Sequence, residues 1–373
     1  MPRYGDYAEP STMRCFPPRP YRNSATQGGG VEMRTKLVIL GFAAAVVLSC
    51  GLAGFSEAAY KPEFKSSLVV GPGGPWGESS AKFADLLKER TQGRINVKNY
   101  YAGQLFAGKQ TNEFTLLNQG VADFAFGSTI NWSPQVKELN VLFMPFLVSS
   151  YKAQDAIQAS EAGKKLLQLM ESKGVIPLAW GENGFRQVTN SKRAIKSPSD
   201  LDGLKIRTTS SPIFIDIFRA LGANPVNMNW GEAQTAFQQG TVDGQENPVV
   251  SVIIPSKLWT SQKHITFWNY VNDPLVLGMS KLTFDSLTAE DKAIVKKTAE
   301  EVMAWQKKGS RHGLEDSNEA IETLKKNGME VTVLSAKEIE PFKAKTKAAY
   351  EKWTTEIGVD LVKAAERAVA AAK

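Results

Sequence analysis

Residues 239–248 read Gln-Gly-Thr-Val-Asp-Gly-Gln-Glu-Asn-Pro, and the first five of them repeat an earlier pattern. At residues 119–123 the chain reads Gln-Gly-Val-Ala-Asp. In both places a predicted helix ends at Gln-Gly, and the chain returns to a predicted strand close to the Asp. Gly120 and Gly240 suit the position just after a helix, where glycine adopts a left-handed conformation at little cost. The pattern is short, but its recurrence in the same context predicts two related halves.

Strands and helices alternate on either side of both copies. Runs of apolar or alternating residues predict strands at 66–70, 94–101, 121–126, 175–180 and 204–208. The spacing of Phe83, Leu86 and Leu87 predicts a helix over 78–90, and residues 110–118 are also predicted to be helical. This order of elements predicts an α/β fold, in which helices form layers on a sheet.

The C-terminal part of the chain is predicted to be mainly helical. Thr288 stands three residues before Asp291, an arrangement typical of a capped helix start. From there to about Lys326 the chain has no proline, which predicts one helix of about 35–40 residues. A helix of that length is too long for one small domain, so we expect it to run across two. Residues 336–373 are also predicted to be helical, with Pro341 near their start.

The only long apolar run of the sequence covers residues 37–56 and follows the basic Arg34 and Lys36. Together with the small residues near Ala58, it predicts a signal peptide over residues 33–58. Two alternatives stay open: an uncleaved membrane anchor, since about 20 apolar residues can cross a bilayer, and lipid attachment at Cys50. We interpret residues 1–32 as a non-native upstream extension that precedes the natural start.

Composition and charge narrow the possible functions. The 373 residues include 45 Lys+Arg, 38 Asp+Glu, 2 Cys and 2 His. Loss of residues 1–59 would remove both cysteines and lower the formal charge from +7 to +5, which is spread along the chain. So few Cys and His residues argue against a metal centre or a thiol enzyme. Scattered charge argues against nucleic acid as a partner. We therefore expect no cofactor, no metal and no nucleic acid.

Polar segments rich in Gly, Asn and Trp lie at the ends of several predicted strands. They cover residues 127–132, 181–187, 204–207, 224–230 and 243–248. In open α/β sheets ligands bind where such segments converge, outside the carboxyl ends of the strands. The guanidinium groups of Arg186 and Arg207 could each donate two parallel hydrogen bonds to a carboxylate. For each arginine taken alone, a surface salt bridge is the alternative.

Five segments together resemble the solute-binding proteins of TRAP transporters, the DctP family. They are Tyr-Ala-Gly-Gln-Leu at 101–105, Asn-Gly-Phe-Arg-Gln at 183–187, Gly-Leu-Lys-Ile-Arg at 203–207, Ala-Leu-Gly-Ala-Asn-Pro at 220–225, and residues 242–248. The resemblance implies a two-lobe periplasmic binding protein (type II-like), with hinge strands and a long helix spanning both lobes. We assign residues 60–183 and 273–312 to lobe I, and residues 184–272 and 313–373 to lobe II.

The resemblance also implies a carboxylate ligand in the cleft between the lobes. Arg207 would form the main ion pair with the carboxylate, Arg186 and Asn247 would help to hold it, and Trp230 would pack on the ligand. Ser128, Asn131 and Trp76 complete the candidate site. Sialic-acid binders of this family frequently have Phe where this chain has Trp230 and a Glu near the position of Ser128, which argues against sialic acid.

The sequence therefore predicts a periplasmic, monomeric protein that binds an organic acid and delivers it to the small and large membrane subunits of a TRAP transporter. Trp76, Trp132 and Trp230 favour an apolar or aromatic carboxylate, while dicarboxylates, hydroxy or keto acids and sugar acids stay open. The first alternative is an exported hydrolase or lyase, although the sequence has no G-x-S-x-G or H-E-x-x-H motif. The second is a binding protein that signals to a membrane receptor.

Overall fold

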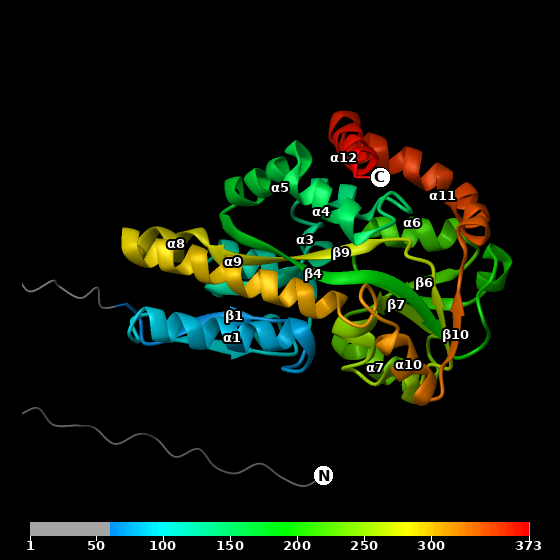
Figure 1. Cartoon of the computed structure of the whole chain (residues 1–373), viewed down its shortest axis with the longest axis horizontal. Helices are drawn as coiled ribbons and strands as arrows, with labels where there is room; N and C mark the ends of the chain where they lie inside the picture. The colour runs from blue at the N-terminus through cyan, green and yellow to red at the C-terminus, as the bar shows by residue number, and fades with distance from the viewer. Residues whose placement is uncertain (1–59, 373) are drawn as a thin grey trace, which may run out of the picture. The chain divides into compact units, whose positions relative to one another are not determined.

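The structure is a computed structural model that describes residues 60–372. The predicted signal peptide, its alternatives at Cys50 and the upstream extension lie outside the described residues. Strands and helices alternate through most of the described chain (Figure 1). The strands are β1 Phe64–Ser67, β2 Val97–Tyr100, β3 Phe124–Ser128, β4 Val175–Asn190, β5 Lys205–Thr208, β6 Asn224–Asn227, β7 Gly244–Pro248, β8 His264–Phe267, β9 Asn272–Ser280 and β10 Glu330–Val333. The helices are α1 Gly74–Arg90, α2 Glu113–Asn118, α3 Thr129–Trp132, α4 Tyr151–Ala159, α5 Glu161–Ser172, α6 Pro212–Ala220, α7 Trp230–Gln239, α8 Lys281–Ser286, α9 Ala289–Arg311, α10 Glu319–Lys326, α11 Ala336–Ile357 and α12 Val359–Ala371.

The strands form one mixed sheet with the order β2-β1-β3-β9-β4-β7-β5-β6, and β8 joins β4 to β10. At one end β1 is parallel to β2 and β3, and at the other end β5 is parallel to β6 and β7. Between these ends, β9 runs antiparallel to β3, and β4 runs antiparallel to both β9 and β7. The two parallel groups therefore have the same internal order.

Equivalent hydrogen bonds confirm that the two halves share one plan. The backbone N–H of Asp123 donates to the carbonyl of Lys65 (2.8 Å), and the Asp123 carboxylate accepts from the N–H of Lys65 (2.7 Å). Asp243 makes the same two bonds with Lys205, at 2.8 and 2.9 Å. In both copies the preceding glycine has a positive φ. The Asp of each Gln-Gly-x-x-Asp pattern thus fixes the register of a parallel strand pair.

Strand β4 passes from one half of the sheet to the other. It pairs with β9 from Val175 to Phe185, and with β7 from Arg186 to Asn190. The prediction of a strand that stops at residue 180 is therefore wrong, as is the placement of residues 181–187 at a strand end. The backbone of Glu182 in this segment has a partner inside the protein, since Gln306 bonds both its N–H and its carbonyl (2.9 and 2.7 Å).

Helices cover both faces of the sheet. One face carries α4, α5, α6, α11 and α12, and the other carries α1, α7, α9 and α10 (Figure 1). Each face has its own apolar core, and each core takes residues from both halves of the chain. Phe83 and Phe237 lie in one core, and Phe143 and Phe214 lie in the other. Each apolar core therefore packs residues of the two halves against one another.

The predicted helix from Thr288 to about Lys326 is two helices. α9 is capped by Thr288, whose hydroxyl accepts from the N–H of Asp291 as expected, and it ends at Arg311. Gly313 then has φ +77°, and the side chain of Asp316 accepts its N–H (2.7 Å). This turn starts a new direction for α10. α9 still reaches both halves, because Ser310 in its last turn contacts Ser251 (3.0 Å).

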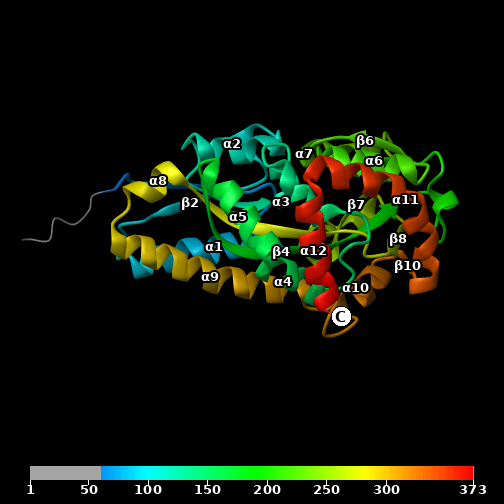
Figure 2. The same ribbon diagram turned by 90° about the horizontal axis from the view of Figure 1, so that it is seen from above.

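The C-terminal helical segment is also divided, at Gly358 with φ +114°. α12 turns back there and packs against α4 and α5 (Figure 2). The division into lobe I (60–183 and 273–312) and lobe II (184–272 and 313–373) stays a proposal. Under that division α12 would link the lobes, because it belongs to lobe II and contacts α4 and α5 of lobe I. No helix within residues 60–372 is long and apolar enough to span a bilayer.

Two glycines of α7 give opposite predictions for the same substitution. Gly240, after the helix, has φ +67°, whereas Gly231 is inside the helix, and a Cβ at either position would meet no atom within 4 Å. We expect Gly240→Ala to lower the free energy of unfolding by about 1 kcal/mol through backbone strain. Gly231→Ala should raise it by about 0.5 kcal/mol through helix propensity. Urea unfolding of both variants measures the two effects, and changes of the same sign would contradict this account of the helix end.

Candidate ligand-binding site

A cavity lies where the parallel strands of both halves end. Five of these six strands, all except β2, contribute lining residues at or just beyond their carboxyl ends. They are Val69 and Val70 after β1, Ser128 and Asn131 at and after β3, Arg207 and Thr209 at and after β5, Trp230 after β6, and Asn247 near the end of β7. Open α/β sheets bind ligands at this edge. The cavity is therefore where the topology predicts a ligand.

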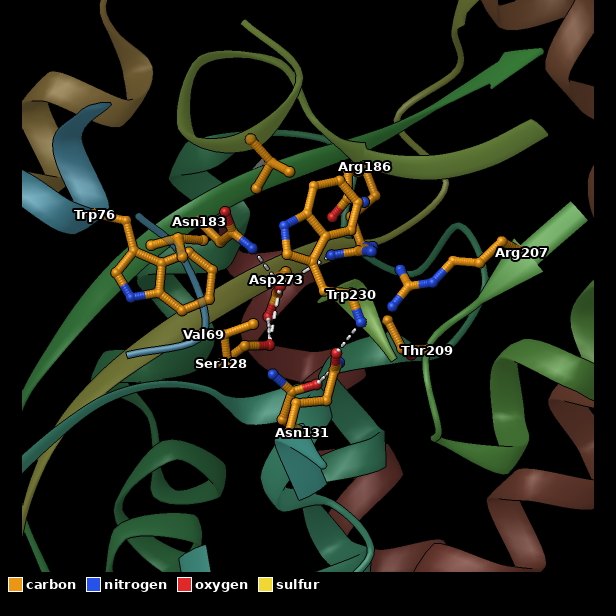
Figure 3. Close-up of a pocket in the computed structure, with 14 residues that line it drawn as sticks. Val69, Trp76, Ser128, Asn131, Asn183, Arg186, Arg207, Thr209, Trp230 and Asp273 are labelled. Atoms are coloured by element: carbon orange, nitrogen blue, oxygen red, sulfur yellow. Dashed lines mark hydrogen bonds and ion pairs between the residues drawn. The ribbon is translucent and has the colours of Figure 1, made fainter. Parts of the chain in front are cut away.

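All seven candidate residues predicted from the sequence line this cavity: Trp76, Ser128, Asn131, Arg186, Arg207, Trp230 and Asn247. Figure 3 shows the two arginine side chains approaching it from different strands, with Trp76 on the opposite side from Arg207. All seven are at most 8% exposed. The structure thus brings together residues from positions 76 to 247.

Arg186 has its charge neutralised by the protein itself. Its guanidinium donates two hydrogen bonds to the Glu246 carboxylate and one to Asp273 (3.1 Å), and a further bond goes to the Glu246 carbonyl (2.7 Å). Burial alone would lower the pKa of Arg186, but the two carboxylates raise it above its ordinary value. Arg186 is therefore a buried, paired cation at the point where β4 changes halves.

Asp273, on β9, joins this pair to the cavity. It accepts hydrogen bonds from Ser128 Oγ (2.8 Å) and Asn183 Nδ2 (2.7 Å), in addition to the bond from Arg186. Burial raises the pKa of Asp273 to about 6, and the charge of Arg186 opposes that rise. At pH 7 the carboxyl is therefore mainly ionised, and it places a negative charge beside the cavity.

Arg207 is buried without a comparable partner. Its Nε donates to the carbonyl of Met228 (2.9 Å), and its guanidinium carbon lies 5.5 Å from the ring centre of Trp230. Its Nη2 has no hydrogen-bond partner among the described residues, although the side chain is only 1% exposed. Burial lowers the pKa of Arg207 to about 10. A buried charge of this kind needs an anion.

Two further buried polar atoms at the cavity have no partner among residues 60–372. They are the hydroxyl oxygen of Thr209 and Oδ1 of Asn183. Asn183 is the extra residue of a β-bulge, because its neighbours Glu182 and Gly184 pair with the adjacent Pro274 and Asp273. Bulges reorient a side chain out of the regular alternation. Buried polar atoms rarely lack a partner, so these atoms and Arg207 together indicate a polar ligand.

Gln110, in a helical turn over Gln110–Asn112, links both sides of the cavity. Its Nε2 donates to Asn131 Oδ1 (2.6 Å), and its Oε1 accepts the backbone N–H of Trp230 (2.8 Å). Because the backbone N–H can only donate, these bonds fix the orientation of both amides. The Nδ2 donor of Asn131 therefore remains for another partner.

The tryptophans have different roles. Trp76 and Trp230 form walls of the cavity, and Trp76 donates its indole N–H to the carbonyl of Phe126 (2.7 Å). Trp132, also predicted near the cleft, does not line the cavity. It is fully buried in the core and donates to the carboxyl of Glu113 (3.1 Å). Two of the three tryptophans, Trp76 and Trp230, are therefore placed to contact an aromatic ligand.

Sequence analysis did not select the other lining residues: Val69, Val70, Gln110, Asn183, Thr209, Val252 and Asp273. Asn183 lies in a segment singled out for its polarity, and Thr209 is two residues from Arg207. Asp273 had no such signal, because its partners are at positions 128, 183 and 186. Among the described residues no cluster of His, Cys, Asp and Glu could hold a metal ion.

Comparison with known proteins identifies the family. Residues 66–356 match the model of the DctP family, described as bacterial extracellular solute-binding protein, family 7. The match covers most of the chain, so the protein belongs to this family. Its members are solute-binding transport proteins rather than enzymes.

Solved structures confirm the two-lobe α/β fold. The chain is 49% identical to a TRAP periplasmic solute-binding protein from Ralstonia eutropha H16 with bound (S)-2-hydroxy-2-methyl-3-oxobutanoate, with a TM-score of 0.82 and coverage of 83% of this chain and 99% of that one. It is 33% identical to the sugar acid binding protein of Advenella mimigardefordensis in complex with galactonate, with a TM-score of 0.79 and coverage of 83% and 98%. A solute-binding protein of Verminephrobacter eiseniae is 41% identical over 209 residues, which span 56% of this chain and 62% of that protein.

The two arginines should differ in their effect on the stability of the ligand-free protein. Arg186→Met would leave Glu246 and Asp273 buried without their cation, and should lower the free energy of unfolding by about 3–5 kcal/mol. Arg207→Met removes a charge that has no carboxylate partner, so the free energy of unfolding should stay the same or rise. Urea unfolding at pH 7 tests both variants. An equal loss in both would show that the protein pairs Arg207 as well as Arg186.

Proposed function

We propose that the protein captures a small organic acid and that Arg207 forms the main ion pair with its carboxylate. The observation that carries this proposal is the buried guanidinium of Arg207, whose Nη2 has no partner among the described residues. A carboxylate matches the planar geometry of a guanidinium and can accept two of its hydrogen bonds. The relatives from Ralstonia and Advenella support this class of ligand, since both hold carboxylic acids.

The remaining candidates then have separate roles. Asn131 and Asn247 supply neutral hydrogen-bond donors, and Trp230 packs beside the guanidinium and the ligand. Trp76 forms the opposite wall, and Ser128 holds Asp273 in place. In this proposal Arg186 acts through its neighbours, because its own donors are already bound to Glu246 and Asp273.

Binding would be coupled to closure of the two lobes about β4 and the segment that connects β8 with β9. The cavity takes residues from both halves, so a ligand contacts both only when they are closed. Closure without a ligand buries the unpaired charge of Arg207, whereas closure on a carboxylate buries a pair. A ligand that interacts better with the closed state shifts the population toward it.

The biological role follows from the family. We propose an extracytoplasmic, monomeric binding protein, exported by its N-terminal segment, that delivers the acid to the small and large membrane subunits of a TRAP transporter. Lipid attachment at Cys50 would be an alternative way to keep the protein at the membrane. Uptake of a labelled acid into vesicles that contain the membrane subunits, with and without this protein, tests delivery.

Loss of the Arg207 guanidinium should abolish high-affinity binding. Truncation of one partner of a buried charge pair costs about 2–5 kcal/mol, which corresponds to a loss of roughly 30-fold to 5,000-fold in affinity. Arg193→Met is the matched control, because Arg193 also donates to backbone carbonyls but lies outside the cavity. Calorimetric titration with a panel of organic acids measures both variants. Equal affinities for wild type and Arg207→Met would refute the assignment, and recovery of chemically altered acid would indicate an enzyme.

A further inference from the structure

Two arginines line the cavity, but only Arg207 lacks an ion-pair partner among the described residues. Arg186 and Arg207 are the only cations among the described lining residues, and Asp273 is the only lining anion. Arg186 is bound to both Asp273 and Glu246, so two carboxylates already face its single charge. Only Arg207 remains to pair with a ligand. The cavity therefore offers one place for one carboxylate.

A second carboxylate on the ligand would meet an unfavourable environment. Away from Arg207 the lining consists of the ion pair between Arg186 and Asp273, neutral polar groups and the apolar side chains of Val69, Val70, Val252 and Trp76. Like charges about 5 Å apart repel by an amount equivalent to roughly a hundredfold in affinity at an effective dielectric constant of about 20. Apolar walls add the cost of removing water from the charge.

A hydrogen-bond donor on the ligand would find a partner at Asn183. The Nδ2 group of Asn183 donates to the carboxylate of Asp273 (2.7 Å), which leaves Oδ1 as the atom without a partner. A buried amide oxygen accepts a hydrogen bond and cannot donate one. The bulge that carries Asn183 brings this residue to the cavity, and Thr209 adds a second hydroxyl-binding group near Arg207 (Figure 3).

From this arrangement we infer that the site selects small hydroxylated monocarboxylates and rejects dicarboxylates of similar size. The inference rests on the proposed function, because it takes Arg207 as the partner of the ligand carboxylate. Its new element is the role of Asp273 and Asn183 in specificity. The acids bound by the Ralstonia and Advenella relatives are both monocarboxylates with a hydroxyl group beside the carboxylate, in agreement with this choice.

Three acids of similar size distinguish the effect of the ligand hydroxyl from the effect of a second carboxylate. 2-Hydroxy-3-methylbutanoate has one carboxylate and a hydroxyl, 3-methylbutanoate lacks the hydroxyl, and malate has a carboxymethyl group in place of the isopropyl group. In calorimetric titrations of the full-length exported protein at pH 7, we expect the first acid to bind tightest. Loss of the hydroxyl should weaken binding at least tenfold, because Asn183 Oδ1 then stays unpaired. Malate should bind roughly a hundredfold more weakly.

Asp273→Asn tests the origin of the discrimination against malate. The substitution keeps the shape of the side chain and removes its charge, so the preference for 2-hydroxy-3-methylbutanoate over malate should fall about tenfold or more. If Asp273 only supports the structure, both affinities would fall together and their ratio would not change. An unchanged ratio would therefore overturn its role in specificity.

Outcomes for the inference and for the proposed function can be told apart. If malate binds as tightly as 2-hydroxy-3-methylbutanoate, and Arg207→Met abolishes binding of both, the inference is wrong and the ion pair stands. Equal binding of 3-methylbutanoate and its hydroxylated form would overturn the role of Asn183. If no acid of either class binds to the wild-type protein, and gluconate and 2-oxo acids also fail, the proposed function itself is refuted.

Discussion

The buried guanidinium of Arg207 is the feature on which the rest of this account depends. Arginine stays charged under nearly all conditions, and burial of that charge without an anion is costly. The protein satisfies Arg186, its neighbour in the cavity, with Glu246 and Asp273, but gives Arg207 only the carbonyl of Met228 and the face of Trp230. In the proposed function this difference separates a structural cation, Arg186, from a ligand-binding one, Arg207. Closure of the protein would then depend on a ligand, because the ligand would supply the missing negative charge.

The sheet creates this arrangement by bringing two equivalent halves together edge to edge. In each half an Asp fixes a parallel strand pair in the same register, so the carboxyl ends of both pairs reach a common cavity. β4 crosses between the halves and carries Asn183 and Arg186 at the crossing. Residues at the crossing are bonded to both halves of the sheet, and they are well placed to link the shape of the cavity with the relative position of the lobes. Because the protein belongs to the DctP family of extracellular solute-binding proteins, this cavity is the expected place for a solute.

Local sequence patterns predicted the two related halves, whereas the resemblance to the DctP family was needed to assign ligand-binding roles to Arg186, Arg207, Trp230 and Asn247. These predictions rest on short patterns: the repeated Gln-Gly-x-x-Asp, and the clusters of Gly, Asn, Trp and Arg. Each can be recognised from a few neighbouring residues. Three features could not be predicted in the same way. The polar segment 181–187 continues a strand by pairing with β9 and β7, and Gln306, more than 100 residues away, also bonds its backbone. The break after α9 depends on the backbone conformation of His312 and Gly313, and the neutralisation of Arg186 depends on Asp273 and Glu246, which are distant in sequence. Trp132 was misplaced for a related reason, since only the fold shows which side of a short helix faces the core.

A crystal structure of the protein with a bound hydroxy acid tests the central claim most directly. We predict that the ligand carboxylate lies within about 3 Å of the Arg207 guanidinium, including its Nη2 atom. Arg186 should keep its bonds to Glu246 and Asp273, and a ligand hydroxyl should donate to Asn183 Oδ1. A ligand carboxylate that displaces Glu246 or Asp273 from Arg186, with Arg207 still unpaired, would contradict the account.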